Sequence, residues 1–195
     1  MKMKPRFGRV ITAMITPFTK EGAVDLDGAV ELARWLVDQG NDGLVLAGTT
    51  GESPTLTHDE QVALVEVVAD AVDVHVIAGA GSNDTVAAVE LTERCTVAGA
   101  DAILTVTPYY NRPSQAGLFE HFRVVAEATE LPVLLYDIPP RSGRKIELAT
   151  MLRLADEVDN VVGVKDAAGD LAETARVVAA APDGFEVYSG EDALT

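Results

Sequence analysis

The most informative stretch of this chain is Asn160-Val-Val-Gly-Val-Lys-Asp166. Its run of apolar, mostly β-branched residues predicts a strand that is buried on both faces, as in a parallel sheet. Lys165 stands at the end of that run, where a buried ammonium group is costly unless it is paired or loses its proton. A lysine that loses its proton near neutral pH is a nucleophile for carbonyl carbon. Two ordinary alternatives are an amine that reaches solvent from the strand end and one paired with Asp166.

Similar apolar runs recur along the chain, separated by segments with apolar residues at positions i, i+3, i+4 and i+7. The other predicted strands are residues 9–15, 43–47, 74–78, 102–106, 133–136 and 185–188. Helix start signals fit this division, because Thr57-His-Asp-Glu60 has the form of a capping box and Ser114 precedes a later helical pattern. Gly40 and Gly99 stand where helices are expected to end.

This alternation of strand and helix repeats about every 30 residues, which is typical of βαβ units. It predicts an α/β fold and favours a (β/α)8 TIM barrel over an open doubly wound sheet. Such a barrel needs about 250 residues. We therefore expect one barrel domain over residues 1–195, truncated after the seventh strand, with strand 8 and any C-terminal helical region missing.

Composition excludes several classes of protein. The chain carries 31 acidic against 15 basic residues, a net charge of −16, which argues against nucleic-acid binding. It has neither an apolar stretch long enough to span a bilayer nor the apolar run of a signal peptide, so we expect a cytoplasmic protein without a membrane partner. Cys95 is the only cysteine and is expected to be a small buried hydrophobe. No metal-ligand spacing stands out, so no metal is predicted.

Polar, glycine-rich residues follow the predicted strands, at the face where barrels of this kind build their sites. The segments are Gly48-Thr-Thr-Gly-Glu-Ser53, Gly79-Ala-Gly-Ser-Asn-Asp84, Thr107-Pro-Tyr-Tyr-Asn-Arg-Pro113, Tyr136-Asp-Ile-Pro-Pro-Arg-Ser-Gly143, Lys165-Asp-Ala-Ala-Gly169 and Ser189-Gly-Glu-Asp192.

Each segment has more than one interpretation. The first is either a tight turn or an anion-binding nest of backbone N–H groups. The second lacks the third glycine of a dinucleotide fingerprint, which disfavours nucleotide binding. Arg141 is either a fork for a carboxylate or a surface arginine, and Tyr109 and Tyr110 are either packing residues or part of a site.

Four of these motifs together resemble the class I pyruvate-dependent aldolases, specifically the dihydrodipicolinate synthase (4-hydroxy-tetrahydrodipicolinate synthase) family. They are Gly48-Thr-Thr-Gly-Glu-Ser53, Thr105-Val-Thr-Pro-Tyr-Tyr-Asn-Arg-Pro-Ser114, Tyr136-Asp-Ile-Pro-Pro-Arg-Ser-Gly143 and Gly163-Val-Lys-Asp166. The resemblance covers residues 9–192, and it implies a lyase of lysine and diaminopimelate biosynthesis that condenses pyruvate with L-aspartate 4-semialdehyde.

The resemblance also implies a role for each site residue. Lys165 forms a Schiff base with pyruvate, so that no external cofactor is needed. Thr50 binds the pyruvate carboxylate, and Arg141 receives the carboxylate of the semialdehyde. Tyr136 relays protons with Thr49 and Tyr110. Gly48 and Gly190 complete the set of substrate-binding residues.

Tyr110 is expected to reach in from a neighbouring subunit, which predicts a homo-oligomer, in this family usually a homotetramer built as a dimer of dimers. His58, Asn83 and Tyr109 match an allosteric lysine site. Gln61 and Ala87 depart from the His and Glu of lysine-inhibited members, so lysine control stays open.

Two further alternatives remain. One is a sister aldolase that acts on 2-keto-3-deoxy sugar acids or N-acetylneuraminate, against which Arg141 and the Tyr-Tyr-Asn-Arg-Pro segment speak. The other is a non-catalytic ligand-binding barrel. Asp137 and Pro140 replace the Asn and Ser usual in the synthase family, which leaves the aldehyde preference open.

Overall fold

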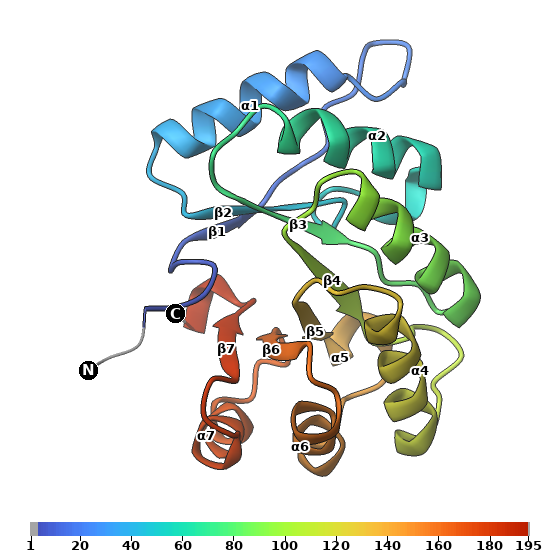
Figure 1. The fold of residues 1–195 in the computed structure, drawn as a ribbon, viewed down its shortest axis with the longest axis vertical. Helices are drawn as coiled ribbons and strands as arrows, with labels where there is room; N and C mark the ends of the chain where they lie inside the picture. The colour runs from blue at the N-terminus through green and yellow to red at the C-terminus, as the bar shows by residue number, and fades with distance from the viewer. Residues whose placement is uncertain (1–3, 195) are drawn as a thin grey trace. The chain divides into compact units, whose positions relative to one another are not determined.

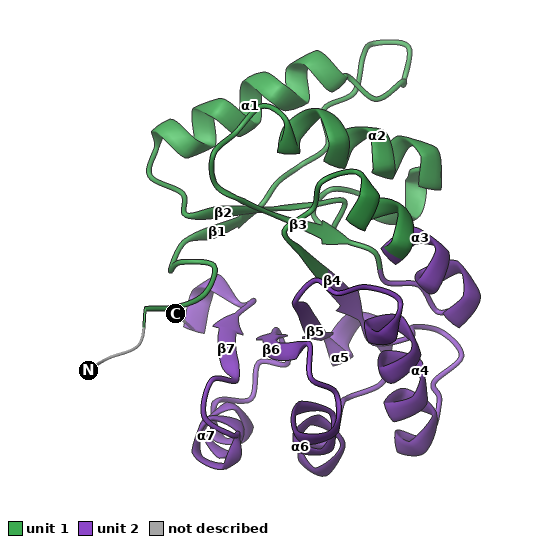
Figure 2. Cartoon of the chain, in the orientation of Figure 1, with its two compact units in different colours: residues 1–80, 93–103 green, residues 81–92, 104–195 purple. Residues whose placement is uncertain are grey.

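The computed structural model describes residues 4–194 of the chain. The chain divides into two compact units, coloured separately in Figure 2. Unit 1 comprises Met1–Ala80 and Glu93–Ile103, and unit 2 comprises Gly81–Thr92 and Leu104–Thr195. That residues 1–195 form a single domain stays a prediction.

The strands follow one another in chain order within one sheet, from β1 to β7, with a helix between most successive strands (Figure 1). They are β1 (Ile11–Ala13), β2 (Gly43–Leu46), β3 (His75–Gly79), β4 (Ala102–Val106), β5 (Val133–Asp137), β6 (Val161–Asp166) and β7 (Glu186–Ser189). Strand β1 pairs in parallel with β2, β2 with β3, β5 with β6, and β6 with β7. The seven predicted strands and the (β/α)-barrel class are confirmed, although β1 is shorter than the predicted run.

Unit 1 contains β1, β2 and β3, with α1 (Leu26–Asp38) and α2 (His58–Ala69) packed against each other (Figure 1). Strand β2 is buried along its whole length, as its uninterrupted apolar sequence predicts. A short 3-10 helix, η1 (Ser53–Thr55), lies between β2 and α2. Helix α3 (Thr85–Val97) and strand β4 begin in one unit and end in the other.

The predicted helix boundaries in unit 1 are confirmed. The Thr57 hydroxyl accepts a hydrogen bond from the backbone N–H of Glu60, and the Glu60 carboxylate accepts one from the backbone N–H of Thr57, which completes the capping box. Gly40 follows α1 with a φ of +94°, and Gly99 follows α3 with a φ of +95°, a conformation that glycine adopts without a steric penalty.

Unit 2 contains β5, β6 and β7 with the helices α4 (Gln115–Glu127), α5 (Pro139–Ser142), α6 (Leu148–Glu157) and α7 (Leu171–Ala180). Helix α6 packs against α4, α7 and strand β6 (Figure 1). The core of unit 2 includes Phe122, Leu135 and Val164, none of which is exposed. As predicted, Ser114 caps α4 by accepting a hydrogen bond from the backbone N–H of Gly117. A second 3-10 helix, η2 (Asp192–Leu194), follows β7.

The short helix α5 was not predicted from the sequence. Pro139 fits the first turn of a helix because proline has no backbone N–H, and the first N–H groups of a helix have no partner within it. Gly143 ends the helix with a φ of +71°. Burial of Cys95, at 1% exposure, is confirmed. Over residues 4–194, none of the helices has the length and apolar character that crossing a membrane requires.

Candidate functional site

Lys165 lies near the carboxyl end of β6, between two tyrosines. In the strand register, Tyr136 on β5 and Tyr188 on β7 are its direct neighbours. The Lys165 ammonium nitrogen lies 4.6 Å from the centroid of the Tyr136 ring. Tyr136 is buried and Lys165 is half-buried. Side chains of register partners on adjacent strands project to the same face, so the amine and the buried phenol share one side of the sheet.

The surroundings of Lys165 favour its neutral form. Burial lowers the pKa of the Lys165 amine, because water no longer solvates the ammonium ion, and the carboxylate of Asp192 opposes this by a smaller amount. The carboxylate of the neighbouring Asp166 is bound by other groups. It accepts hydrogen bonds from the backbone N–H of Ala168, at 3.0 Å, and from the Thr174 hydroxyl, at 2.5 Å. This arrangement disfavours the alternative in which Lys165 is a strand-end lysine paired with Asp166.

Gly190 leaves room for the Lys165 side chain. A methyl group at position 190 would lie 3.0 Å from Cε of Lys165 and 2.9 Å from Cβ of Ala167. The backbone N–H of Gly190 donates a hydrogen bond to the carbonyl of Asp166 at 2.7 Å, which holds the end of β7 against β6. Glycine at this position therefore determines how closely the chain approaches the lysine.

Arg141 lies in α5, directly after β5, and is exposed. Its segment follows Asp137, whose carboxylate is buried and bonds to Lys145 and Ile146. Arg112 comes close to the same segment from the loop after β4, since a methyl group at Gly143 would lie 2.9 Å from Nε of Arg112. An exposed guanidinium at the carboxyl end of a strand is available to a carboxylate ligand.

Tyr110 is 90% exposed and has a φ of +71°, an uncommon backbone conformation for a residue with a bulky side chain. The loop that carries it is anchored on both sides. Thr107 donates two hydrogen bonds to the Tyr136 carbonyl, from its backbone N–H and from its hydroxyl. The Asn111 side-chain amide donates to the Asn83 carbonyl at 3.0 Å. The ring of Tyr110 is therefore exposed on a loop that hydrogen bonds hold at both ends. Tyr109, beside it, is half-buried.

Gly48, Thr49 and Thr50 lie in unit 1, directly after β2. Both threonines are exposed, and the flanking residues Ala47 and Glu52 have φ values of +50° and +58°. Thr16 fastens the segment by donating a hydrogen bond from its hydroxyl to the Gly51 carbonyl at 2.6 Å. Strained backbone around a polar turn is common where a loop binds a ligand.

The structure therefore brings Lys165, Tyr136 and Gly190 together within unit 2. In the same unit Arg141 lies in α5, and Tyr110, Tyr109 and Asn83 lie on loops after the strands. Gly48, Thr49, Thr50 and His58 belong to unit 1, and His58 begins helix α2. The roles assigned to these residues stay predictions.

The sequence prediction assigned no role to two neighbours of the lysine, although Asp192 lies in one of the polar segments that follow the strands. Tyr188 is its register partner on β7, and its hydroxyl donates a hydrogen bond to Glu186 at 2.6 Å. Asp192 is the carboxylate that acts on the Lys165 pKa. The position of Tyr188 at the end of the last predicted strand was an available signal, because aligned parallel strands place their last residues side by side.

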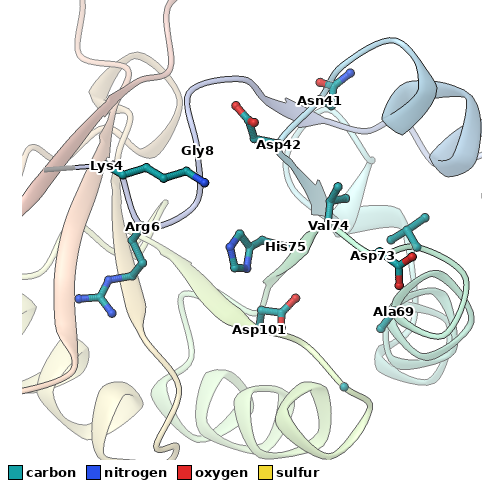
Figure 3. Close-up of a pocket in the computed structure, with 12 residues that line it drawn as sticks. Lys4, Arg6, Gly8, Asn41, Asp42, Ala69, Asp73, Val74, His75 and Asp101 are labelled. Atoms are coloured by element: carbon teal, nitrogen blue, oxygen red, sulfur yellow. The ribbon is translucent and has the colours of Figure 1, made fainter.

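A cavity of about 470 Å³ lies in unit 1, at the amino ends of β2 and β3 (Figure 3). Lys4, Arg6 and His75 line it together with the carboxylates of Asp42 and Asp101. Both carboxylates accept backbone hydrogen bonds that fix strand starts, from Arg9 and Val10 in one case and from Val76 in the other. In barrels the residues at this end serve stability, and the catalytic loops lie at the other end.

Within the described residues, His, Cys, Asp and Glu form no group of three or more that could hold a metal ion.

Comparison with known proteins gives consistent matches over nearly the whole chain. The model of the dihydrodipicolinate synthetase family matches residues 6–195. The 4-hydroxy-tetrahydrodipicolinate synthase of Moorella thermoacetica is 54% identical over 192 residues, which cover 97% of this chain and 65% of the relative. The crystal structure of dihydrodipicolinate synthase from Bacillus anthracis is 47% identical with a TM-score of 0.95, over 98% of this chain and 66% of that one.

The synthase of Cyanidioschyzon merolae, solved with lysine bound, is also 47% identical, with a TM-score of 0.96 over 98% of this chain and 66% of that one. This chain therefore spans 65% of the length of the Moorella relative and a similar share of the two solved chains.

Proposed function

Because the chain belongs to the dihydrodipicolinate synthetase family, we propose that it carries the activity of its named relatives, the 4-hydroxy-tetrahydrodipicolinate synthases. The reaction is the condensation of pyruvate with L-aspartate 4-semialdehyde, in lysine and diaminopimelate biosynthesis. The observation that carries the proposal is the half-buried Lys165, whose pKa is lowered by burial and whose amine lies 4.6 Å from the Tyr136 ring.

The proposed chemistry begins at the lysine. The neutral amine of Lys165 attacks the keto carbon of pyruvate, and loss of water forms an imine. The imine withdraws electrons from the adjacent methyl group, which loses a proton to become an enamine. The enamine carbon attacks the aldehyde of the second substrate. The amino group of that substrate then displaces Lys165 as the ring closes, which regenerates the free lysine.

Each of these steps moves a proton, for which the proposal uses the hydroxyl of Tyr136 with Thr49 and Tyr110. Thr50 and Gly48 hold the pyruvate carboxylate, and Arg141 receives the carboxylate of the semialdehyde. The imine supplies the electron sink, so the proposal needs no external cofactor.

We also propose that the chain works as a homo-oligomer in the cytoplasm, in the tetrameric form predicted from the resemblance. The outward-facing Tyr110 supports a partner subunit, because a tyrosine with 90% of its surface exposed leaves a large apolar ring in water. Sedimentation of the full natural chain at several concentrations tests this proposal. A single monomeric species that turns over substrate would contradict it.

The decisive experiment is reductive trapping. Pyruvate with borohydride is expected to add a stable adduct to the peptide that carries Lys165 in the full natural chain. Lys165→Arg is the control, since a guanidinium stays protonated and forms no imine. Turnover with pyruvate and aspartate semialdehyde, compared with cleavage of 2-keto-3-deoxy sugar acids and N-acetylneuraminate, separates the synthase from the sister aldolases. Pyruvate binding without any adduct would refute the mechanism.

A further inference from the structure

Asp137 is a buried carboxylate at the end of strand β5, next to Tyr136. Only 1% of its side chain is exposed. One oxygen, Oδ1, accepts a hydrogen bond from the backbone N–H of Ile146 at 3.0 Å. The other, Oδ2, lies 3.2 Å from the ammonium nitrogen of Lys145, a side chain that is 33% exposed.

These two contacts close a loop in the chain. The loop leaves β5 at Asp137, forms α5 with Arg141, and returns to Asp137 at residues 145–146. The carboxylate therefore holds the end of this segment against its beginning. Arg141 lies near the middle of the enclosed residues, so its position depends on how the two ends are joined.

Helix α4 holds the same segment from another side. Gln115, its first residue, donates a hydrogen bond to the Lys145 carbonyl at 2.9 Å and accepts one from the backbone N–H of Glu147 at 3.1 Å. Ser142, inside the segment, donates to the carbonyls of Ile138 and Arg144. Neutral hydrogen bonds thus hold the backbone of the segment, and the ion pair of Asp137 with Lys145 adds an attraction between opposite charges.

The charge at Asp137 has a cost that its partners offset. Burial raises the pKa of this carboxyl, the carboxylate of Asp166 on the neighbouring strand adds to the rise, and Lys145 and the Ile146 N–H oppose it. A buried carboxylate that loses its cation is left uncompensated, which is strongly destabilising. The two side chains are therefore coupled, and a substitution of either one should loosen the segment between them.

We propose that Asp137 and Lys145 are a positioning pair, which holds the segment that carries Arg141 in the place where it receives the carboxylate of the aldehyde substrate. This inference rests on the proposed function and deepens it. Neither residue of the pair touches substrate. Their effect reaches the reaction through Arg141, so it should appear in the second substrate and not in imine formation at Lys165.

The test uses Asp137→Asn and Lys145→Gln in the full natural chain. Asp137→Asn keeps a carbonyl oxygen for the Ile146 N–H and removes the negative charge, and Lys145→Gln removes the positive charge while keeping a shorter, polar side chain. Both are expected to raise the KM for aspartate semialdehyde about tenfold, because small misplacement of a substrate-holding group has large kinetic effects. The KM for pyruvate and the yield of the trapped Lys165 adduct should stay within twofold of the wild type.

Three further variants sharpen the test. Lys145→Arg keeps the ion pair, so its KM for aspartate semialdehyde should stay close to the wild-type value. The double variant Asp137→Asn with Lys145→Gln should be less impaired than the product of the two single effects, because two amides can pair with each other. Lys20→Gln, an exposed lysine in unit 1, is the matched control for loss of a positive charge and should behave as wild type.

Hydrogen exchange gives a readout that does not depend on turnover. The backbone amides of residues 138 and 141–147 should exchange at least fivefold faster in both single variants, while those of α7 (Leu171–Ala180) should not change. Unchanged exchange in the segment, or faster exchange with an unchanged aldehyde KM, would overturn the positioning pair. A wild-type protein that forms no pyruvate adduct would instead refute the proposed function, and with it the purpose assigned to the pair.

Discussion

Replacing Gly190 by alanine tests whether the Lys165 amine is positioned by the absence of a side chain opposite it. The added methyl group would lie 2.9 Å from Cβ of Ala167, 3.0 Å from Cε of Lys165 and 3.1 Å from Cγ of Lys165. Favourable carbon–carbon contacts lie at about 3.5–4.0 Å, so all three distances are too short. Cβ of Ala167 is attached directly to the backbone. The adjustment therefore falls on the lysine stem, on the strand ends, or on both.

The size of the effect follows from the cost of one excess methyl group in a packed site, about 1–3 kcal/mol. A free-energy change of about 1.4 kcal/mol alters a rate tenfold. If the strain is relieved only by displacement of the amine from its reactive position, the full free energy adds to the barrier, and imine formation slows by roughly 5- to 150-fold. If part is met by the backbone, the protein also loses stability by the corresponding fraction.

The assay is the rate at which pyruvate and borohydride modify Lys165, followed by mass spectrometry of the peptide that carries it, together with the Tm. Gly117→Ala is the control, because the shortest contact of a methyl group there, 3.3 Å to Cβ of Pro113, is longer than all three contacts at Gly190, and alanine favours the helix in which Gly117 lies. We expect the control to be modified at the wild-type rate.

A Gly190→Ala protein with both the wild-type modification rate and the wild-type Tm would refute the reasoning. An equal loss of rate in Gly117→Ala would show that the effect is general and does not originate at the lysine.

The remaining predictions concern charge and strand packing. Asp192→Asn removes the negative charge that raises the pKa of Lys165, so the pH profile of adduct formation should shift to lower pH, and a shift to higher pH would contradict the assignment. Burial lowers the pKa of His121 from 6.5 to about 4, so the free energy of unfolding should fall by about 3 kcal/mol as the pH drops through that window, and His121→Phe should remove this part of the dependence in denaturant titrations. Gly163→Ala would place a methyl group 2.4 Å from the backbone carbonyl oxygen of Glu186, so we expect a loss of several kcal/mol in stability and little folded protein, whereas a wild-type Tm would contradict the parallel pairing of β6 with β7.

The strands and most helices were predictable because their signals are local. The apolar run that includes Val161 and Val164 is short and rich in β-branched residues, which favours a buried strand. Thr57 and Glu60 specify a helix start through two hydrogen bonds three residues apart. Helix α5 was missed because its two prolines are as typical of a rigid loop as of a first helical turn.

The candidate site was predictable in its reactive group and less so in its surroundings. Lys165 is conspicuous in the sequence because a charge at the end of a buried strand is costly, and Tyr136 is conspicuous for the same place on its own strand. Tyr188 also ends a predicted strand and Asp192 lies just after it, but a tyrosine and an acidic residue are ordinary in such places, and the sequence does not show how near they lie to Lys165. Their importance comes from the register of β6 and β7 and from the charge that Asp192 places near the amine.

Local sequence was sufficient to predict the order of the strands and of most helices, several helix ends, and an anomalous lysine at the end of a buried strand, because each depends on residues within about one turn or one strand of each other. The folded chain was needed to show which side chains surround that lysine and which contacts hold the segment that carries Arg141. The approach of Gly190 to the Lys165 stem and the ion pair of Asp137 with Lys145 depend on strand register and on the path of a loop in space. Local sequence does not specify either of these, because both are set by packing between distant parts of the chain.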